Sequence, residues 1–149
     1  MTTLNLPPFD AKVKGTREKP QIFDFLRRRY VALTPEECVR QHFVHFLVEQ
    51  KGYPPTLLAN EVPLTMGGKR LRADSVLYDR ELRPRMIMEY KAPEVTITQE
   101  TFNQISAYNL LLRVEYLVVS NGLTHYCLRL SREQNRYDFL PDIPAYQDL

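Results

Sequence analysis

Residues 70–92 read RLRADSVLYDRELRPRMIMEYKA, and this stretch decides the fold. Polar and apolar residues alternate over residues 70–78, and residues 84–92 form a second strand-like run after a polar turn. Alternation with a period of two predicts half-buried strands, and a short polar turn between them predicts an antiparallel hairpin. The apolar residues 86–88 indicate that the second strand is central in a sheet.

A helix is predicted over residues 35–51, before this hairpin. Thr34 suits the N-cap, Pro35 suits the first helical position, and Glu37 occupies the acidic position of a capping box. Apolar residues recur within the segment at helical spacing, and Gly52 follows as a C-terminal cap.

The remaining elements place the chain in the α/β class. Asn121-Gly122 is a strong hairpin signal between two strand-like runs. These elements predict an α/β fold, a mixed β-sheet flanked by helices. The further elements are strands over residues 57–65, 116–120 and 124–130, a turn at residues 66–69 and a helix over residues 99–113.

Composition indicates one soluble domain. The chain has 149 residues, of which 44% are hydrophobic and 26% charged, as in ordinary globular domains. It contains no apolar run of membrane-spanning length, no recognisable signal peptide and only two cysteines. We therefore expect a cytoplasmic protein with no membrane contact.

The first 33 residues differ from the rest of the chain. Residues 1–30 carry seven basic and three acidic side chains, whereas the C-terminal segment is acidic. We predict that residues 1–33 form an irregular basic arm that packs on a domain of residues 34–149 and contributes one short strand. A basic arm permits contact with nucleic acid without requiring it.

Three charged side chains are predicted to converge on the hairpin. If Asp79 and Pro84 close the turn as a pair, the register places Asp74 opposite Glu89, with their Cβ atoms about 4.5–5.5 Å apart. Like charges in such positions destabilise a sheet unless a positive group lies between them, and Lys91 lies on the same face as Glu89. Carboxylate oxygens suit Mg²⁺ or Mn²⁺.

These residues resemble a known nuclease motif. Asp74, fourteen intervening residues and Glu89-Tyr90-Lys91 are similar to the PD-(D/E)xK motif, although Ala73 stands where that motif has proline. Over about residues 20–130 the chain resembles the N-terminal nuclease domain of the R subunit of type I restriction-modification enzymes. This resemblance implies a restriction-endonuclease-like fold, a mixed β-sheet flanked by helices with an α-β-β-β-α-β core. The further motifs that carry this resemblance are TPEECVRQ at 34–41, EYKAP at 89–93, QISAYN at 104–109 and VVSNG at 118–122.

The resemblance implies specific roles for the site residues. Asp74, Glu89 and the Tyr90 carbonyl would bind Mg²⁺ or Mn²⁺, and Lys91 would orient or deprotonate the attacking water. Glu37 would add an acid from the first helix, with Arg40 at the E-x-x-R spacing. A helix-capping role accounts for an acid at Glu37 equally well, and Glu36 is an alternative candidate for the acid of the site. Gln104 and Tyr108, neighbours on one helix face, would contact the substrate phosphate or steady Lys91.

The implied function is metal-dependent hydrolysis of DNA phosphodiester bonds, leaving 5′-phosphate and 3′-hydroxyl ends. The implied partners are DNA and a helicase/translocase or methylation-specificity complex. R subunits continue into an ATP-driven translocase, so we expect either a stand-alone relative or a piece of a larger subunit. The residues expected to contact DNA are Lys69, Arg70, Arg72 and Arg40, although a solvated edge explains the first three equally well.

Two other functions stay open. The chain could be a non-catalytic DNA-binding or assembly module that retains the nuclease fold. It could also be a nuclease that acts on RNA or on branched DNA. Metal binding that depends on Asp74 would separate a working site from a vestigial one.

Overall fold

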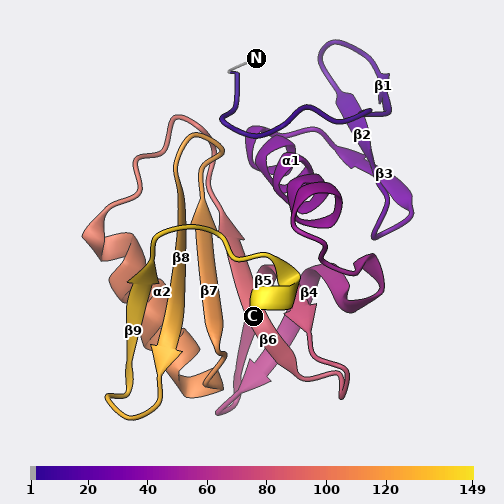
Figure 1. Ribbon diagram of the computed structural model, residues 1–149. Coiled ribbons are helices and arrows are strands. Elements are labelled where there is room, and N and C mark those ends of the chain that lie inside the picture. The colour runs from indigo at the N-terminus through magenta and orange to yellow at the C-terminus, as the bar shows by residue number, and fades with distance from the viewer. Residues whose placement is uncertain (1–2) are drawn as a thin grey trace.

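The computed structural model describes residues 3–149, except for the side chains of residues 66, 107, 108 and 110–112. Two sheets and two α-helices make up this part of the chain (Figure 1). The small sheet contains β1 (Val13–Gly15), β2 (Pro20–Asp24) and β3 (Arg29–Ala32). The large sheet contains β4 (Leu58–Met66), β5 (Lys69–Tyr78), β6 (Pro84–Tyr90), β7 (Tyr116–Ser120), β8 (His125–Ser131) and β9 (Arg136–Leu140). The helices are α1 (Pro35–Gln50) and α2 (Gln99–Leu112), with short 3₁₀ turns at Pro55–Leu57 and Tyr146–Asp148.

The large sheet is mixed, as predicted. Its strands lie in the order β4-β5-β6-β7-β8-β9. Only the β6–β7 pair is parallel in the described sheet, and α2 forms the crossover between these two strands. The predicted α-β-β-β-α-β order is confirmed by α1, β4, β5, β6, α2 and β7.

The two helices cover opposite faces of the large sheet. Phe43 of α1 belongs to a buried cluster with Met86 and Met88, whereas Phe102 of α2 belongs to a second cluster with Ile87. Successive residues of a strand point to opposite faces, so the alternation within β6 separates the two clusters. The apolar run at residues 86–88 is therefore buried on both sides, which makes β6 a central strand.

Helix α1 begins at the predicted residue, Pro35, and ends at Gln50, one residue before the predicted end. The Thr34 hydroxyl accepts a hydrogen bond from the Glu37 backbone N–H at 3.1 Å, and Pro35 occupies the first turn. At the other end Gly52 has a φ of +74°, a left-handed conformation that favours glycine and ends a helix.

Replacing Thr34 by alanine removes the acceptor for an orphan N–H at the start of α1. We expect the free energy of unfolding to fall by about 1 kcal/mol. Urea unfolding followed by circular dichroism measures this loss, and Thr124→Ala, at an exposed turn position, is the control. Equal stability of Thr34→Ala and wild type would contradict the assignment of the cap.

The N-terminal segment differs from the prediction. Residues 13–32 form a three-stranded antiparallel sheet, where the sequence indicated an irregular arm with one short strand. The small sheet lies beside α1 (Figure 1), and its central strand β2 buries Ile22 and Asp24. The signal was obscured because the strands have only 3, 5 and 4 residues, and only two of these residues, both in β2, are buried.

The turn between β5 and β6 also differs by one residue from the prediction. Tyr78, rather than Asp79, pairs with Pro84, and a bulge lies between Leu77 and Tyr78. The bulge restores the predicted register further along, where Ser75 pairs with Met88. Strand β6 ends at Tyr90, two residues before the predicted end.

Neither described helix is long and apolar enough to span a lipid bilayer.

Candidate functional site

Asp74 and Glu89 lie on neighbouring strands, as the sequence predicted. The last ladder pair at this end of the hairpin is Ser75 with Met88. Asp74 and Glu89 are the next residues on β5 and β6, so they come side by side where the two strands separate. Both side chains are partly exposed, which leaves them accessible from solvent.

The Asp74 carboxylate takes the place of a ladder partner. The Tyr90 backbone N–H donates to Asp74 Oδ2 at 2.8 Å. One carboxylate oxygen is therefore held against β6, and the side chain is fixed next to Glu89. The following residue, Lys91, donates its backbone N–H to the Ser120 carbonyl at 2.9 Å, so the end of β6 is anchored on both sides.

Arg40 holds the main chain of Asp74 from the other side. Its Nη1 donates to the Asp74 carbonyl oxygen at 2.7 Å, and its Nη2 pairs with Glu61 Oε1 at 2.7 Å. Nε and Nη2 also donate to the Glu37 carboxylate at 2.9 and 3.0 Å. Arg40 is only 7% exposed. The structure therefore places it among protein groups, and direct contact with DNA stays a prediction for this residue.

Glu61 distorts β4 directly opposite Asp74, and sequence reasoning missed it. Its φ is +56°, and Glu61 and Asp74 are left out of the otherwise continuous β4–β5 pairing. The side-chain alternation of β5 breaks here: Ala73 belongs to the α2-side cluster with Val76, although the sequence placed it on the face of Ser75. A non-glycine residue at positive φ persists only where its surroundings hold it, and Arg40 does so here.

Glu37 lies in the first turn of α1, and its side chain is buried. It is 5% exposed and accepts bonds from Arg27 at 2.7 Å and Gln41 at 3.1 Å, in addition to those from Arg40. The rival residue, Glu36, is exposed. The structure thus connects Glu37 to Asp74 through Arg40, and its role as a catalytic acid stays a prediction.

The carboxyls of Asp24 and Glu37 link folding to pH. Burial acts to raise both pKa values, but the hydrogen bonds that these carboxyls accept, chiefly from Arg27 and Arg40, lower both below their ordinary values. A carboxyl with a lowered folded-state pKa stabilises the native state above its unfolded-state pKa, and this contribution is lost as the pH falls through the folded value.

We therefore expect the free energy of unfolding to decrease below about pH 4.5. The difference between wild type and Asp24→Asn should shrink as the pH falls, because the wild-type carboxylate becomes neutral. Urea unfolding at pH 7, 5, 4 and 3 measures both effects. A constant difference down to pH 3 would contradict the coupling.

Several of the other predicted site residues are exposed. Gln104 is exposed on α2, while the side chain of Tyr108 lies outside the described residues. The structure gives the Lys91 ammonium no hydrogen bond or ion pair with any described residue. Lys69, Arg70 and Arg72 are exposed on the β4–β5 hairpin, and Arg72 forms a loose pair with Glu61 at 3.4 Å.

The donor set fits a hard cation. In the part of the chain that the structure describes, no group of three or more His, Cys, Asp or Glu side chains could hold a metal ion. Asp74, Glu89 and the Tyr90 carbonyl supply oxygen ligands only, and water would complete the shell. Mg²⁺ commonly binds to one or two carboxylates while it keeps several waters, so this incomplete set suits Mg²⁺ or Mn²⁺.

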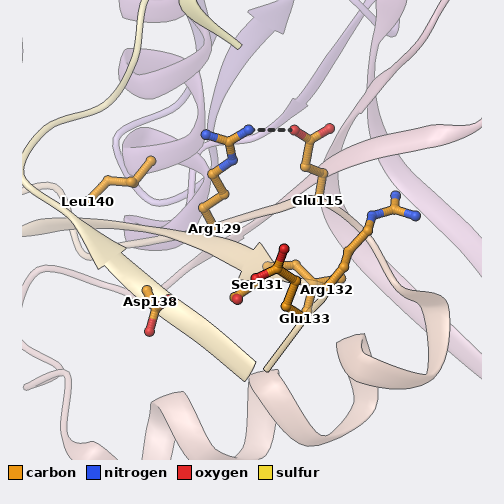
Figure 2. Close-up of a pocket in the computed structure, with 8 residues that line it drawn as sticks. Glu115, Arg129, Ser131, Arg132, Glu133, Asp138 and Leu140 are labelled. Carbon is orange, nitrogen blue, oxygen red and sulfur yellow. Dashed lines mark ion pairs between the residues drawn. The ribbon is translucent and has the colours of Figure 1, made fainter. Parts of the chain in front are cut away.

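A separate pocket of about 530 Å³ lies at the opposite end of the sheet, where β7 and β9 begin and β8 ends. Arg129 and Glu115 form an ion pair at this pocket (Figure 2), in which Arg129 Nη2 and Glu115 Oε1 are 3.6 Å apart. None of the predicted site residues lines it. The lining residues are Glu115, Arg129, Leu130, Ser131, Arg132, Glu133, Asp138 and Leu140.

Comparisons with known proteins agree with the fold and with the motif succession. The family described as Type I restriction enzyme R protein N terminus matches residues 35–144. A fragment structure of a putative HsdR subunit of a type I restriction enzyme from Vibrio vulnificus YJ016 has a similar fold, with a TM-score of 0.54 at 20% identity. The similarity covers 76% of this chain and 24% of that chain, so the present chain corresponds to a minor part of that fragment. No curated protein matches the chain. Because the family match covers most of the chain, we conclude that it belongs to the family of type I restriction enzyme R protein N-terminal domains.

Proposed function

We propose that the chain is a metal-dependent endonuclease domain of the PD-(D/E)xK type that hydrolyses phosphodiester bonds in DNA. The observation that carries this proposal is the position of Asp74 beside Glu89 at the separating ends of two strands, with Lys91 directly after β6. A fold places two carboxylates side by side at a cost unless a cation joins them. Membership of the restriction-enzyme R protein family supports a nuclease role.

Each residue of this site has a role in the proposal. Asp74, Glu89 and the Tyr90 carbonyl would hold Mg²⁺ or Mn²⁺, and this ion would supply a water of lowered pKa and a positive charge next to the phosphate. Asp74 is oriented for this by the Tyr90 N–H and, through its main chain, by Arg40. Lys91 orients the attacking water and offsets the charge that develops on the phosphate oxygens.

Basic residues on the hairpin would guide the substrate. Lys69, Arg70 and Arg72 are exposed on the two strands that lead to Asp74, so they can contact phosphates next to the scissile bond. Gln104 is exposed on α2 and can reach a phosphate or Lys91 when DNA is bound. Such contacts make the affinity for DNA dependent on salt concentration.

The proposed partners follow from the family. The HsdR fragment is much longer than this chain, and the remainder of such a subunit would supply a helicase/translocase or contacts to a methylation-specificity complex. In this setting the cleavage activity would depend on partner proteins that bring DNA to the site.

Supercoiled plasmid DNA incubated with the pure protein and Mg²⁺ tests the proposal. Nicking that EDTA abolishes is the expected result, and metal-independent nicking equal in an Asp74→Asn preparation would contradict it. Calorimetry with Mn²⁺ separates the proposal from a non-catalytic DNA-binding module. A working site gives heat that Asp74→Asn removes, whereas a vestigial site gives no heat that depends on Asp74.

A further inference from the structure

A closed circuit of buried polar contacts joins the small sheet to the candidate metal site. One half of the circuit runs through two arginines. Arg27 pairs with Asp24 and donates from Nη2 to Glu37 Oε1 at 2.7 Å. Arg40 then connects Glu37 to the Asp74 carbonyl oxygen.

The other half of the circuit runs through neutral side chains. Asp24 Oδ2 accepts from Asn60 Nδ2 at 2.9 Å, and Asn60 Oδ1 accepts from the Ser75 hydroxyl at 2.6 Å. The Tyr90 hydroxyl donates to Ser75 Oγ at 2.9 Å, and the Tyr90 backbone N–H donates to Asp74 Oδ2. The two halves therefore begin at Asp24 and end on opposite sides of Asp74.

Burial shows why Asp24 matters to this arrangement. The residue is fully buried, and its second oxygen also accepts the backbone N–H groups of Leu26 and Arg27 at 2.8 and 3.2 Å. A buried carboxylate is costly unless every acceptor site is used, and here each bond also fixes the geometry of its donor. Asp24 and Arg27 precede residue 35, so they lie outside the range that the family match covers.

Asp74 depends on this support more than its neighbours do. Residues 75 to 77 are held by ladder bonds to β6, but Asp74 has no ladder partner on either β4 or β6. Its carbonyl is held by Arg40 and its carboxylate by Tyr90. Without Arg27, the side chains that donate to the Glu37 carboxylate would be Arg40 and Gln41. The carboxylate would then move toward them, and Arg40 would shift relative to Asp74.

We propose that Asp24 and Arg27 are positioning residues that orient Asp74, and that the small sheet is part of the support of the candidate site. The catalytic consequence rests on the proposed function, whereas the effect on the geometry of Asp74 does not. The small sheet is then required for a preorganised site in this chain, in addition to the domain that the family match covers.

The test compares Arg27→Gln with Arg29→Gln, which makes the same change two residues away at an exposed position of β3. Hydrogen exchange of the Tyr90 amide reports on its bond to Asp74, and the Val118 amide in the centre of the large sheet reports on global stability. In Arg27→Gln we expect the Tyr90 amide to exchange about tenfold faster relative to the Val118 amide. This is the change in exchange rate expected when local opening loses the net free energy of one hydrogen bond. In Arg29→Gln the ratio should equal that of wild type.

A purely structural role gives a different result. Both amides of Arg27→Gln would then accelerate equally, their ratio would stay at the wild-type value, and the proposal would be overturned. If Arg27→Gln does not fold, Arg27→Lys and Arg29→Lys provide the same comparison with the charge retained.

A metal measurement distinguishes this proposal from the proposed function. Mn²⁺ should broaden the amide signals of residues 74, 89 and 91 in wild type, and about tenfold more Mn²⁺ should be needed in Arg27→Gln, the weakening typical when an outer partner of a ligand is lost. Absence of broadening in wild type would contradict the metal site while leaving the Tyr90 exchange result to decide the positioning role. If broadening is present and requires the same Mn²⁺ concentration in wild type and in Arg27→Gln, only the positioning role is contradicted.

Discussion

Replacing Lys91 by alanine is expected to lower the rate of Mg²⁺-dependent plasmid nicking by about 10³-fold, within the range for loss of a group that assists proton transfer or stabilises developing charge. Lys91 follows Glu89 by two residues, and its ammonium forms no hydrogen bond or ion pair with any described residue. It is therefore available to the water and the phosphate. Its removal leaves Asp74 and Glu89 in place, so Mn²⁺ binding measured by calorimetry should persist.

Glu89→Ala gives the complementary result. It removes a proposed metal ligand, so both nicking and Mn²⁺ heat should be lost, whereas Lys91→Ala should lose only nicking. Lys51→Ala at the end of α1 is a matched control with the same change of charge, and it should nick at the wild-type rate. Equal nicking by wild type, Glu89→Ala and Lys91→Ala would show that the activity comes from a contaminant.

Replacing Arg40 by alanine is expected to destabilise the fold by about 3–5 kcal/mol. The guanidinium is buried, and its loss would take two donated bonds from the buried Glu37 carboxylate, remove the Arg40 donor of the Asp74 carbonyl and leave Glu61 the loose contact with Arg72. A buried acceptor that loses its partner costs its full desolvation penalty. Urea unfolding measures the loss as a lower midpoint.

Arg72→Ala is the matched control for this prediction. Arg72 pairs with the same acid, Glu61, but its side chain is 68% exposed and the contact measures 3.4 Å. Exposed ion pairs contribute at most about 1 kcal/mol. Similar stabilities of Arg40→Ala and Arg72→Ala would contradict a structural role for the buried arginine.

The periodic segments could be predicted from the sequence because local signals and tertiary packing agree in them. Thr34, Pro35 and Gly52 mark the ends of α1, and the Gly67-Gly68 turn, with φ values of +55° and +79°, joins β4 to β5 as predicted. The neighbouring positions of Asp74 and Glu89 were predictable because the hairpin register brings them together. The predicted closing pair of the β5–β6 turn was wrong by one residue, because the alternation of polar and apolar residues does not reveal a bulge.

The support of the site could not be predicted because it depends on contacts between distant segments. Asp24 and Asn60 are 36 residues apart and Arg40 and Asp74 are 34 apart, so no spacing rule joins them. Glu61 looked like an ordinary strand residue, and only its positive φ reveals the distortion opposite Asp74. The sequence predicted that Arg40 contacts DNA. The E-x-x-R spacing does not show whether the arginine side chain points to solvent or into the protein, so its burial could not be predicted.

The position of a Mn²⁺ ion in a crystal of the protein shows whether Asp74 and Glu89 share one cation. We predict an anomalous density peak within about 2.0–2.3 Å of oxygen atoms from both Asp74 and Glu89, as expected for a carboxylate-bound divalent ion, and no such peak in Asp74→Asn. A peak that touches neither carboxylate, or side chains of Asp74 and Glu89 too far apart to share one ion, would contradict it.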